Sequence, residues 1–436
     1  MITDDNKKLA QWAMEYALKN GCQAAKLVLY TNSNSSFELR DGKMDRLQQS
    51  TENGLGLNLY VDGRFGSFST NRLDKKELET LITNGIESTR YLAVDESRML
   101  ADPARYYKGG KPDLQLFDKK LYEVNPDDKV AIARAAAEEV LGKDERIISV
   151  DSSYSDGEGS SYRLISNGFE GESKSTWFSV SASVSIKGEG EARPQDYWYD
   201  SALFYDKLTK TGIGAKALER VLRKLGQKKA KSGKYTMVVD PMNVGNLLSP
   251  MLSALYGSAL QQKNSFLMDK LDTKVAFTLR DEPHAIGANG SRYFDNEGVA
   301  TEPRTVFDKG VLKTYFIDTY NGKKMDIAPT ISAPSRLILT PGDKDLNGLV
   351  ADIKQGILVT GFNGGNSNSS TGDFSYGIEG FLIEDGKLTQ PVNEMNVTGN
   401  MVTLWNSLVA VGNDPQPNRS WQIPSLVFEG VDFSGL

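Results

Sequence analysis

The sequence predicts an α+β fold of two domains, with mainly antiparallel, hairpin-rich sheets packed by helices. Runs of alternating apolar and polar residues are joined by tight-turn residues, which is typical of antiparallel strands. Amphipathic segments stand between groups of these strands without a regular strand–helix alternation, which argues against a parallel sheet. A basic, glycine-bounded linker at 226–233 divides the chain. The predicted domains are therefore 1–225 and 234–436.

Four helices are predicted in the N-terminal half. The first covers 3–20, and the second opens at Asp74 with a capping box. A third starts at Asn125-Pro126, where a side-chain acceptor precedes a proline that fits the first helical turn. A fourth lies near 211–225.

Tight turns between alternating runs predict hairpins in both halves. Asp-Gly is a strong hairpin signal because both turn residues must accept a positive φ. Two such turns, Asp41-Gly42 and Asp62-Gly63, follow one another early in the chain and predict a meander. Two related turns occur in the C-terminal half, at Asp308-Lys309-Gly310 and Glu384-Asp385-Gly386.

The segment 177–186 shows the clearest strand pattern. Its even-numbered positions from Phe178 to Ile186 are apolar, and the odd-numbered positions 179–185 are all serine. A strict period of two predicts a half-buried strand with one solvated or groove-facing side.

Charge and composition exclude several classes of function. The chain has 436 residues and a net charge of −6, which argues against electrostatic binding to nucleic acid or to an anionic membrane. No apolar run approaches the roughly 20 residues of a membrane helix, and the polar start is not a secretory leader. A single cysteine, Cys22, cannot form an internal disulfide, which fits the cytoplasm as the expected compartment.

The count of histidines limits the chemistry further. A zinc hydrolase site usually takes three protein ligands, mostly histidine, and this chain has only His284. Serine- and cysteine-protease mechanisms would each need His284 as their base. It follows Pro283 in a loop-like run, so we expect an exposed or locally hydrogen-bonded loop histidine. We expect Cys22 to be a small buried hydrophobe.

The segment 234–266 organises the C-terminal half. A strand ends at Asp240-Pro241, which predicts a helix start, and apolar residues then recur at three- and four-residue steps to 259. Pro250 interrupts this helical face. It predicts either a kink or a second helix that is capped by Ser249.

Two further stretches have alternative interpretations. Asp295, Glu297 and Glu302 lie close to Arg304 and could bind a cation or act as acid and base, but a tight turn with surface charges explains them as well. The glycine-rich stretch 361–386 lacks a nucleotide-binding motif, and its simplest interpretation is a long flexible loop.

Motifs spread over both halves resemble the TldD/PmbA (TldE) family. The stretch 40–68, the F-D-x-E-G-V run at 294–299, the T-G-D-F-S run at 371–375 and the N-x-x-x-x-V-G-N-D run at 406–414 follow the family pattern in order and spacing. TldD-type members carry His-Glu-x-x-x-His on the helix after residue 240. Ser249, Pro250 and Ala254 stand at those positions here, and none of them can bind zinc or act as a base. The late cysteine ligand of TldD-type members is also missing.

The resemblance implies a metal-free PmbA/TldE-type subunit of a metallopeptidase that acts on unfolded or extended peptides. It implies no cofactor in this chain, zinc in a TldD-type catalytic partner, and possible pairing with a second copy when the chain is alone. The family is tied to microcin precursor maturation, antitoxin turnover and, by name, modulation of DNA gyrase. By the same analogy, residues that line a substrate cleft are expected at Tyr256, Lys263, Asp295, Glu297, Asp373, Phe374 and Ser375.

Two other functions stay open at the level of the sequence. One is a self-associating protein that binds a peptide or another ligand without a role in peptide cleavage. The serine-faced strand and the glycine-rich stretch would serve it. The other is an independent hydrolase that uses Asp295, Glu297 or Ser375, although no base is paired with a nucleophile.

Overall fold

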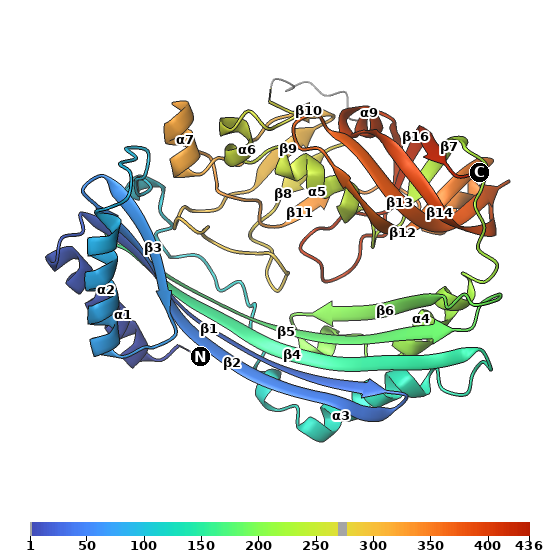
Figure 1. Cartoon of the computed structure of the whole chain (residues 1–436), viewed down its shortest axis with the longest axis horizontal. Coiled ribbons are helices and arrows are strands. Elements are labelled where there is room, and N and C mark those ends of the chain that lie inside the picture. The colour runs from blue at the N-terminus through green and yellow to red at the C-terminus, as the bar shows by residue number, and fades with distance from the viewer. Residues whose placement is uncertain (1, 269–276) are drawn as a thin grey trace.

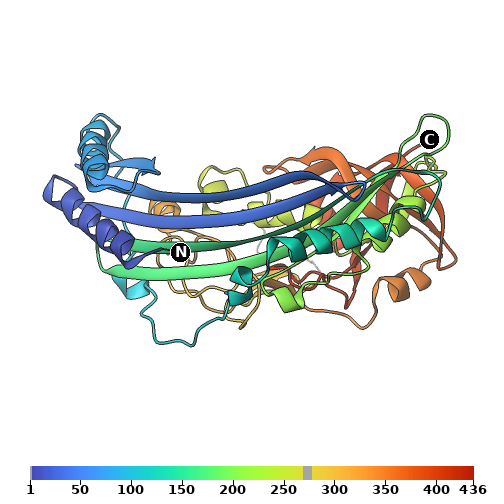
Figure 2. The same ribbon diagram turned by 90° about the horizontal axis from the view of Figure 1, so that it is seen from below.

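A computed structural model describes residues 2–268 and 277–436, and it has the predicted α+β fold. A long curved sheet with helices on its outer face forms the N-terminal half, and the C-terminal body lies over its inner face (Figure 1). Seen from below, the long strands run the length of the molecule with helices in front of them (Figure 2). None of the described helices is both long and apolar enough to cross a membrane.

The N-terminal half contains six strands and four α-helices among the described residues. The strands are β1 (Ala24–Arg40), β2 (Lys43–Val61), β3 (Arg64–Thr70), β4 (Ile147–Ile165), β5 (Phe169–Ile186) and β6 (Gln195–Ala202). The helices are α1 (Asp4–Lys19), α2 (Lys75–Thr89), α3 (Pro126–Glu138) and α4 (Ile213–Leu222), with short 3₁₀ turns η1 (Pro103–Arg105), η2 (Lys119–Tyr122) and η3 (Tyr205–Lys207).

The six strands form one sheet in the order β3-β2-β1-β4-β5-β6, and all neighbours are antiparallel. Both Asp-Gly turns have positive φ and close hairpins, which confirms the meander. The strands are longer than the sequence indicated. The two runs on either side of the polar stretch 31–35 form one strand, because β2 and β4 pair with that stretch from both sides.

The outer face of this sheet carries two separate apolar clusters. One lies under α1 and α2 and includes Leu27 and Leu57; the other lies under α3 and α4 and includes Phe37 and Val180. Between the clusters the same face is polar, and a cavity of about 380 Å³ opens there. This polar band lies at the start of α3, and Lys129 of that helix contributes to its lining.

A buried ion pair lies in this polar band. The Lys129 Nζ is 2.6 and 2.9 Å from the two carboxylate oxygens of Asp156, and the two side chains are only 10% and 2% exposed. Ser35 and Tyr154 also donate hydrogen bonds to the Asp156 carboxylate. The carboxylate therefore depends on Lys129 for its charge balance, since burial of an unpaired charge is costly.

We expect Lys129→Ala to destabilise the fold by about 3–5 kcal/mol, because it leaves the Asp156 carboxylate buried without a counter-ion. Denaturant unfolding of Lys129→Ala, Asp156→Ala and the double variant measures the coupling between the two sites. The exposed pair Lys216–Glu219 in α4, with a 2.9 Å contact, is the control and should couple by less than about 0.5 kcal/mol. If the losses of unfolding free energy in the two single variants simply add up in the double variant, Lys129 and Asp156 are not a coupled ion pair.

The inner face of the sheet is rich in hydroxyl groups. The alternation predicted for 177–186 is confirmed: the apolar side chains of β5 are fully buried under the helices, and the serines are partly exposed on the opposite face. Serines of the neighbouring strand β4 continue this surface, and Ser153 and Ser181 hydrogen-bond across the two strands at 2.8 Å. The ring of Tyr199 on β6 lies 5.1 Å from the guanidinium of Arg419, so this face meets the C-terminal body.

The C-terminal half contains ten strands and five α-helices among the described residues. The strands are β7 (Gly233–Val239), β8 (Leu279–Asp281), β9 (Arg304–Asp308), β10 (Val311–Leu312), β11 (Leu337–Leu339), β12 (Gln355–Ser367), β13 (Asp373–Glu384), β14 (Lys387–Asn400), β15 (Leu408–Val411) and β16 (Leu426–Ser434). The helices are α5 (Gly245–Ser253), α6 (Gly257–Gln261), α7 (Thr319–Met325), α8 (Leu346–Ala351) and α9 (Met401–Asn406).

One sheet of this half curls back on itself. Its order is β14-β13-β12-β7-β16-β15, and a further pairing of β14 with β16 closes the ring. A small sheet, β10-β9-β8-β11, lies beside it. The two hairpin turns predicted at 308–310 and 384–386 are confirmed, with positive φ at Lys309 and Asp385. The division into domains at 226–233 stays a prediction.

Two local predictions in this half were wrong. The helix does not begin at Pro241: the Asp240 carboxylate accepts a hydrogen bond from the Asn243 N–H at 3.0 Å within a turn, and α5 starts at Gly245. The stretch 361–386 is not a flexible loop but the β12–β13 hairpin, in which Gly364, Gly365 and Gly372 take positive φ. Glycine permits those conformations, so the same residues that suggested a loop allow a bent hairpin.

Candidate functional site

Helix α5 and the residue that follows it carry the three positions at which the metal motif of TldD-type members is expected. Ser249 is exposed, Pro250 lies inside the helix and is half-buried, and Ala254, just beyond its end, is completely buried. The Ala254 carbonyl accepts a 2.6 Å hydrogen bond from the Ser265 hydroxyl. Ala254 is therefore enclosed by protein, whereas Ser249 is exposed to solvent.

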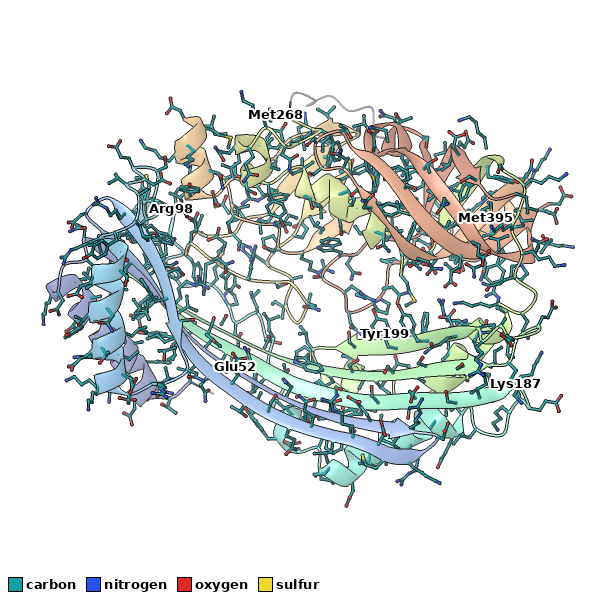
Figure 3. The ribbon with its side chains drawn as sticks, in the orientation of Figure 1. Glu52, Arg98, Lys187, Tyr199, Met268 and Met395 are labelled. Atoms are coloured by element: carbon teal, nitrogen blue, oxygen red, sulfur yellow. The ribbon has the colours of Figure 1, made fainter. Side chains whose placement is uncertain are left out.

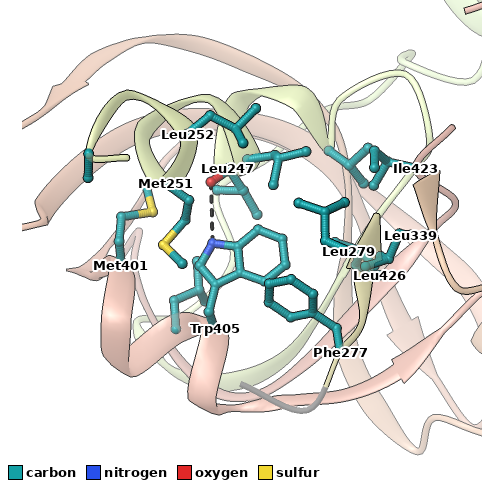
Figure 4. Packing of buried hydrophobic residues seen from close by; sticks show 14 of the residues in the cluster. Leu247, Met251, Leu252, Phe277, Leu279, Leu339, Met401, Trp405, Ile423 and Leu426 are labelled. Atoms are coloured by element: carbon teal, nitrogen blue, oxygen red, sulfur yellow. Dashed lines mark hydrogen bonds between the residues drawn. The ribbon is translucent and has the colours of Figure 1, made fainter. Parts of the chain in front are cut away.

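The inner side of α5 belongs to the largest hydrophobic cluster. Leu247, Met251 and Leu252 pack around Trp405 of α9, whose indole N–H donates to the Leu247 carbonyl at 3.3 Å (Figure 4). The Phe277 ring lies 4.9 Å from the Trp405 ring on another side. Pro250 removes one helical hydrogen bond, and α5 ends only three residues later. The chain then turns at 254–256 into α6, so the second helix begins after Tyr256 and not at Ser249.

A polar hollow of about 650 Å³ lies at the tip of the β12–β13 hairpin. It is lined by Asn264, by the turn residues 366–370 and by Asp373, Phe374 and Ser375. Three of the predicted cleft residues therefore meet at one surface. The asparagines and serines of the turn were missed, because a run such as Asn-Ser-Asn-Ser-Ser has the same composition in a flexible loop and in a binding surface.

The functional groups in this hollow are mostly neutral. Asp373 accepts hydrogen bonds from Asn400 (3.0 Å) and Thr371 (2.7 Å), and these two bonds lower the pKa of its carboxyl. Phe374 is buried, with its ring 5.4 Å from that of Tyr376, and Ser375 is exposed. The hollow thus offers amides, hydroxyls and one carboxylate, which suits hydrogen bonding to a peptide backbone better than nucleophilic chemistry.

Asp295 and Glu297 lie elsewhere, at the junction of the two halves. Asp295 is 2% exposed, and its carboxylate accepts from the N–H groups of Glu297 (2.8 Å), Val299 (3.0 Å) and Ser332 (3.0 Å). All of these contacts are with backbone, so Asp295 holds a turn together. It is not placed to act as an acid or a base on a substrate.

Glu297 connects this turn to the N-terminal sheet. Its Oε2 accepts from the N–H and the hydroxyl of Thr319, both at 2.9 Å, and its Oε1 lies 3.8 Å from the Nζ of Lys26 on β1. Burial lowers the pKa of Lys26, and the nearby Glu297 opposes that shift. Through Glu297, the turn at 294–299 therefore links the C-terminal body to the N-terminal sheet.

The two remaining predicted residues, Tyr256 and Lys263, are not among the residues that line the hollow. Tyr256 is half-buried against Phe316, with ring centroids 6.0 Å apart, and burial raises its pKa. Lys263 is exposed and has a φ of 55°, directly before Asn264, which lines the hollow. Its conformation identifies Lys263 as the residue that ends α6.

The described residues contain no group of three or more histidine, cysteine, aspartate or glutamate side chains that could hold a metal ion. His284 forms a 3.0 Å hydrogen bond with Thr301 and packs beside Tyr293, and burial lowers its pKa. Burial raises the pKa of the Cys22 thiol to about 11. Both residues fit the structural roles expected for them.

Comparison with known proteins defines the family. Residues 25–89, 119–225 and 232–435 match domain 1, the central domain and the C-terminal domain of the PmbA/TldA metallopeptidases. The chain belongs to this PmbA/TldD family, as the sequence motifs indicated.

Individual relatives cover the chain almost completely. A metalloprotease PmbA homologue of Haemophilus influenzae is 27% identical over 98% of this chain and 96% of its own length. The crystal structure of a candidate modulator of DNA gyrase from Bacteroides thetaiotaomicron is 74% identical, covers 100% of both chains and has a TM-score of 0.98. TldE from Thermococcus kodakarensis is 19% identical with a TM-score of 0.82 over 98% of this chain and 99% of its own, which shows a shared fold.

The carboxyl of Asp240 should make stability depend on pH. Burial raises its pKa to about 6, so the folded chain holds a proton that the unfolded chain releases near pH 4. Stability should therefore rise as the pH falls from about 7 to 4, by up to about 3 kcal/mol relative to Asp240→Asn. Denaturant unfolding across this range measures the difference. Asp345→Asn, at the exposed cap of α8, is the control, and a pH-independent difference for Asp240→Asn would contradict the prediction.

Replacement of Lys263 by glycine should stabilise the chain by about 0.5–1 kcal/mol, because a positive φ is strained for lysine and free for glycine. The matched substitution Lys216→Gly, in the interior of α4, should instead cost about 1 kcal/mol. Thermal and denaturant unfolding compare the two. A loss of stability at both positions would mean that Lys263 makes a contact that outweighs its strain.

Proposed function

We propose that this chain is the non-catalytic, PmbA/TldE-type subunit of a two-component metallopeptidase, and that a TldD-type partner supplies the zinc ion. The observation that carries the proposal is the absence of metal-binding side chains at positions 249, 250 and 254. A catalytic zinc site needs three protein ligands and a base, whereas Ser249, Pro250 and Ala254 provide none, and Ala254 is packed in the core.

The task that we propose for this chain is to bind an extended polypeptide and present it to the partner. The hollow at 366–375, in which Asp373 is the one carboxylate, supports this role, because amide and hydroxyl groups can hydrogen-bond to the backbone of any sequence. The long strand β2 supports it as well. Among the described strands, its residues 43–54 pair with β1 on one side only, so their other backbone groups are free to pair with an added strand.

The alternative of an independent hydrolase is less well supported. It would use Asp295, Glu297 or Ser375, yet Asp295 and Glu297 are engaged at the junction of the two halves. The single histidine, His284, is hydrogen-bonded to Thr301 and is not a base for Ser375.

Reconstitution tests the proposal. This chain and a TldD-type protein with an intact His-Glu-x-x-x-His motif should co-purify and cleave unfolded casein, and neither the isolated chain nor its mixture with a partner in which the motif Glu is Gln should do so. We expect the loss on that substitution to be at least about 100-fold, as for removal of a general base.

Ser249→Ala in this chain is the matched control and should leave the rate of casein cleavage unchanged. Cleavage by the isolated chain, or failure to associate with any TldD-type partner, would contradict the proposal.

A further inference from the structure

The polar cavity of about 380 Å³ on the outer face of the N-terminal sheet lies beside the start of α3. The C-terminal body covers the other face of this sheet, so the cavity is separate from the hollow at the tip of the β12–β13 hairpin (Figure 1). Glu52, the residue after Thr51 in β2, marks the place of the cavity along the curved sheet in Figure 3. The proposed function gives this cavity no role.

Strand register places a compact set of polar side chains at the floor of the cavity. Ser33 and Ser35 of β1 are two residues apart and share a face, and Phe37 continues this series into the apolar cluster under α3 and α4. The residues that pair with these two serines on β2 and on β4 lie on the same outer face. The set is Ser33, Ser35, Gln49, Thr51, Asp156 and Glu158.

One part of the floor is a closed network. The Lys129 Nζ contacts both carboxylate oxygens of Asp156 and donates to the Ser35 hydroxyl at 3.2 Å, while the Ser35 hydroxyl donates to Asp156. The charge of Asp156 is therefore balanced by Lys129. This network needs no further ion, and it holds the floor in a fixed position for the groups beside it.

The neighbouring groups offer both hydrogen-bond donors and acceptors. Glu158 is 8% exposed, and its carboxylate accepts a hydrogen bond from the Tyr122 hydroxyl at 2.6 Å. The hydroxyls of Ser33 and Thr51 share a hydrogen bond of 3.1 Å, and Gln49 is exposed on β2. Hydroxyls and amides can both donate and accept, whereas an ionised carboxylate only accepts.

A second side of the cavity carries apolar surface. Leu121 and Tyr122 of η2 line it, and the Phe117 ring lies 6.1 Å from the Tyr122 ring. Tyr122 is 56% exposed, so part of its ring is open to a ligand. The cavity therefore combines an aromatic surface with hydroxyl, amide and carboxylate groups.

We propose that this cavity binds a neutral saccharide. A sugar ring has C–H faces that pack against an aromatic side chain and hydroxyl edges that both donate and accept hydrogen bonds. Tyr122 packs against the ring, and Glu158, Thr51 and Gln49 bind its hydroxyls. The volume of the cavity falls within the roughly 300–1,000 Å³ that is usual for small-molecule sites.

The proposal is tested by ligand-observed NMR titration of the full-length chain. The probes are D-glucose, D-galactose and N-acetyl-D-glucosamine, and at least one of them should bind saturably. Tetrahydropyran-2-methanol has a similar ring with a single hydroxyl, so it should bind at least about tenfold more weakly than that sugar. Methylammonium chloride is the probe for the alternative of a cation site at the carboxylates.

The variants Tyr122→Ala and Gln49→Ala each remove an exposed side chain, so both should fold. We expect each to weaken sugar binding about tenfold, whereas Tyr122→Phe keeps the ring and should stay within about threefold of the wild type. Gln48→Ala is the matched control. The Gln48 side chain lies on the other face of the same strand, where it accepts a 2.7 Å hydrogen bond from Arg46, and its loss should leave sugar binding unchanged.

Weaker sugar binding by Tyr122→Ala and Gln49→Ala, with unchanged binding by Gln48→Ala, would support a saccharide site in this cavity. Absence of saturable binding of all three sugars, or equal binding by these two variants and the wild type, would overturn it. Tetrahydropyran-2-methanol bound as tightly as the sugars, or methylammonium bound in their place, would overturn it as well. No peptidase partner is present in these titrations, so their result is independent of the proposed function.

Discussion

The packing of α5 against Trp405 is the constraint on which the C-terminal half depends. The helix lies in the middle of the largest apolar cluster, and the indole N–H of Trp405 is satisfied by a carbonyl of α5 itself. A buried face of this kind leaves room for alanine at 254 but not for an imidazole without displacement of its neighbours. Helix α5 is packed as a structural element of the C-terminal half, and a polar hollow lies at the tip of the β12–β13 hairpin.

The junction between the two halves depends on a second set of contacts. The turn at 294–299 is closed by Asp295 and tied to β1 through Glu297 and Lys26. Phe294 adds an aromatic contact with Phe169 at the end of the N-terminal sheet, at 5.1 Å between ring centroids. These contacts hold the hydroxyl-rich face of the sheet opposite the C-terminal body. A family motif that looks catalytic in the sequence is thus explained by its structural role.

Local patterns predicted much of the fold. Asp-Gly turns, the alternation at 177–186 and the capping box at Asp74 each depend on residues close in sequence, and each was confirmed. The length of β1 and the hairpin at 361–386 could not be predicted in this way, because polar or glycine-rich stretches become strands only through the partners that pair with them.

Of the residues predicted to line a substrate cleft, only those adjacent in the chain were found together. Asp373, Phe374 and Ser375 do meet in one hollow, since they are adjacent in the chain. Asp295 and Glu297 were grouped with them by family analogy, but the structure places them at the junction of the halves. A cavity between the N-terminal sheet and the C-terminal body, lined by Ser173 and Ser335 among others, gave no signal at all, because a cavity between two distant segments is formed only by tertiary packing.

Location of zinc in the assembled peptidase tests the central claim most directly. The measurement is anomalous diffraction at the zinc edge from crystals of this chain in complex with a TldD-type partner. The account predicts one zinc peak per heterodimer, on the partner's motif helix, and no peak beside Ser249 and Ala254. A zinc ion bound by this chain at α5 would contradict it.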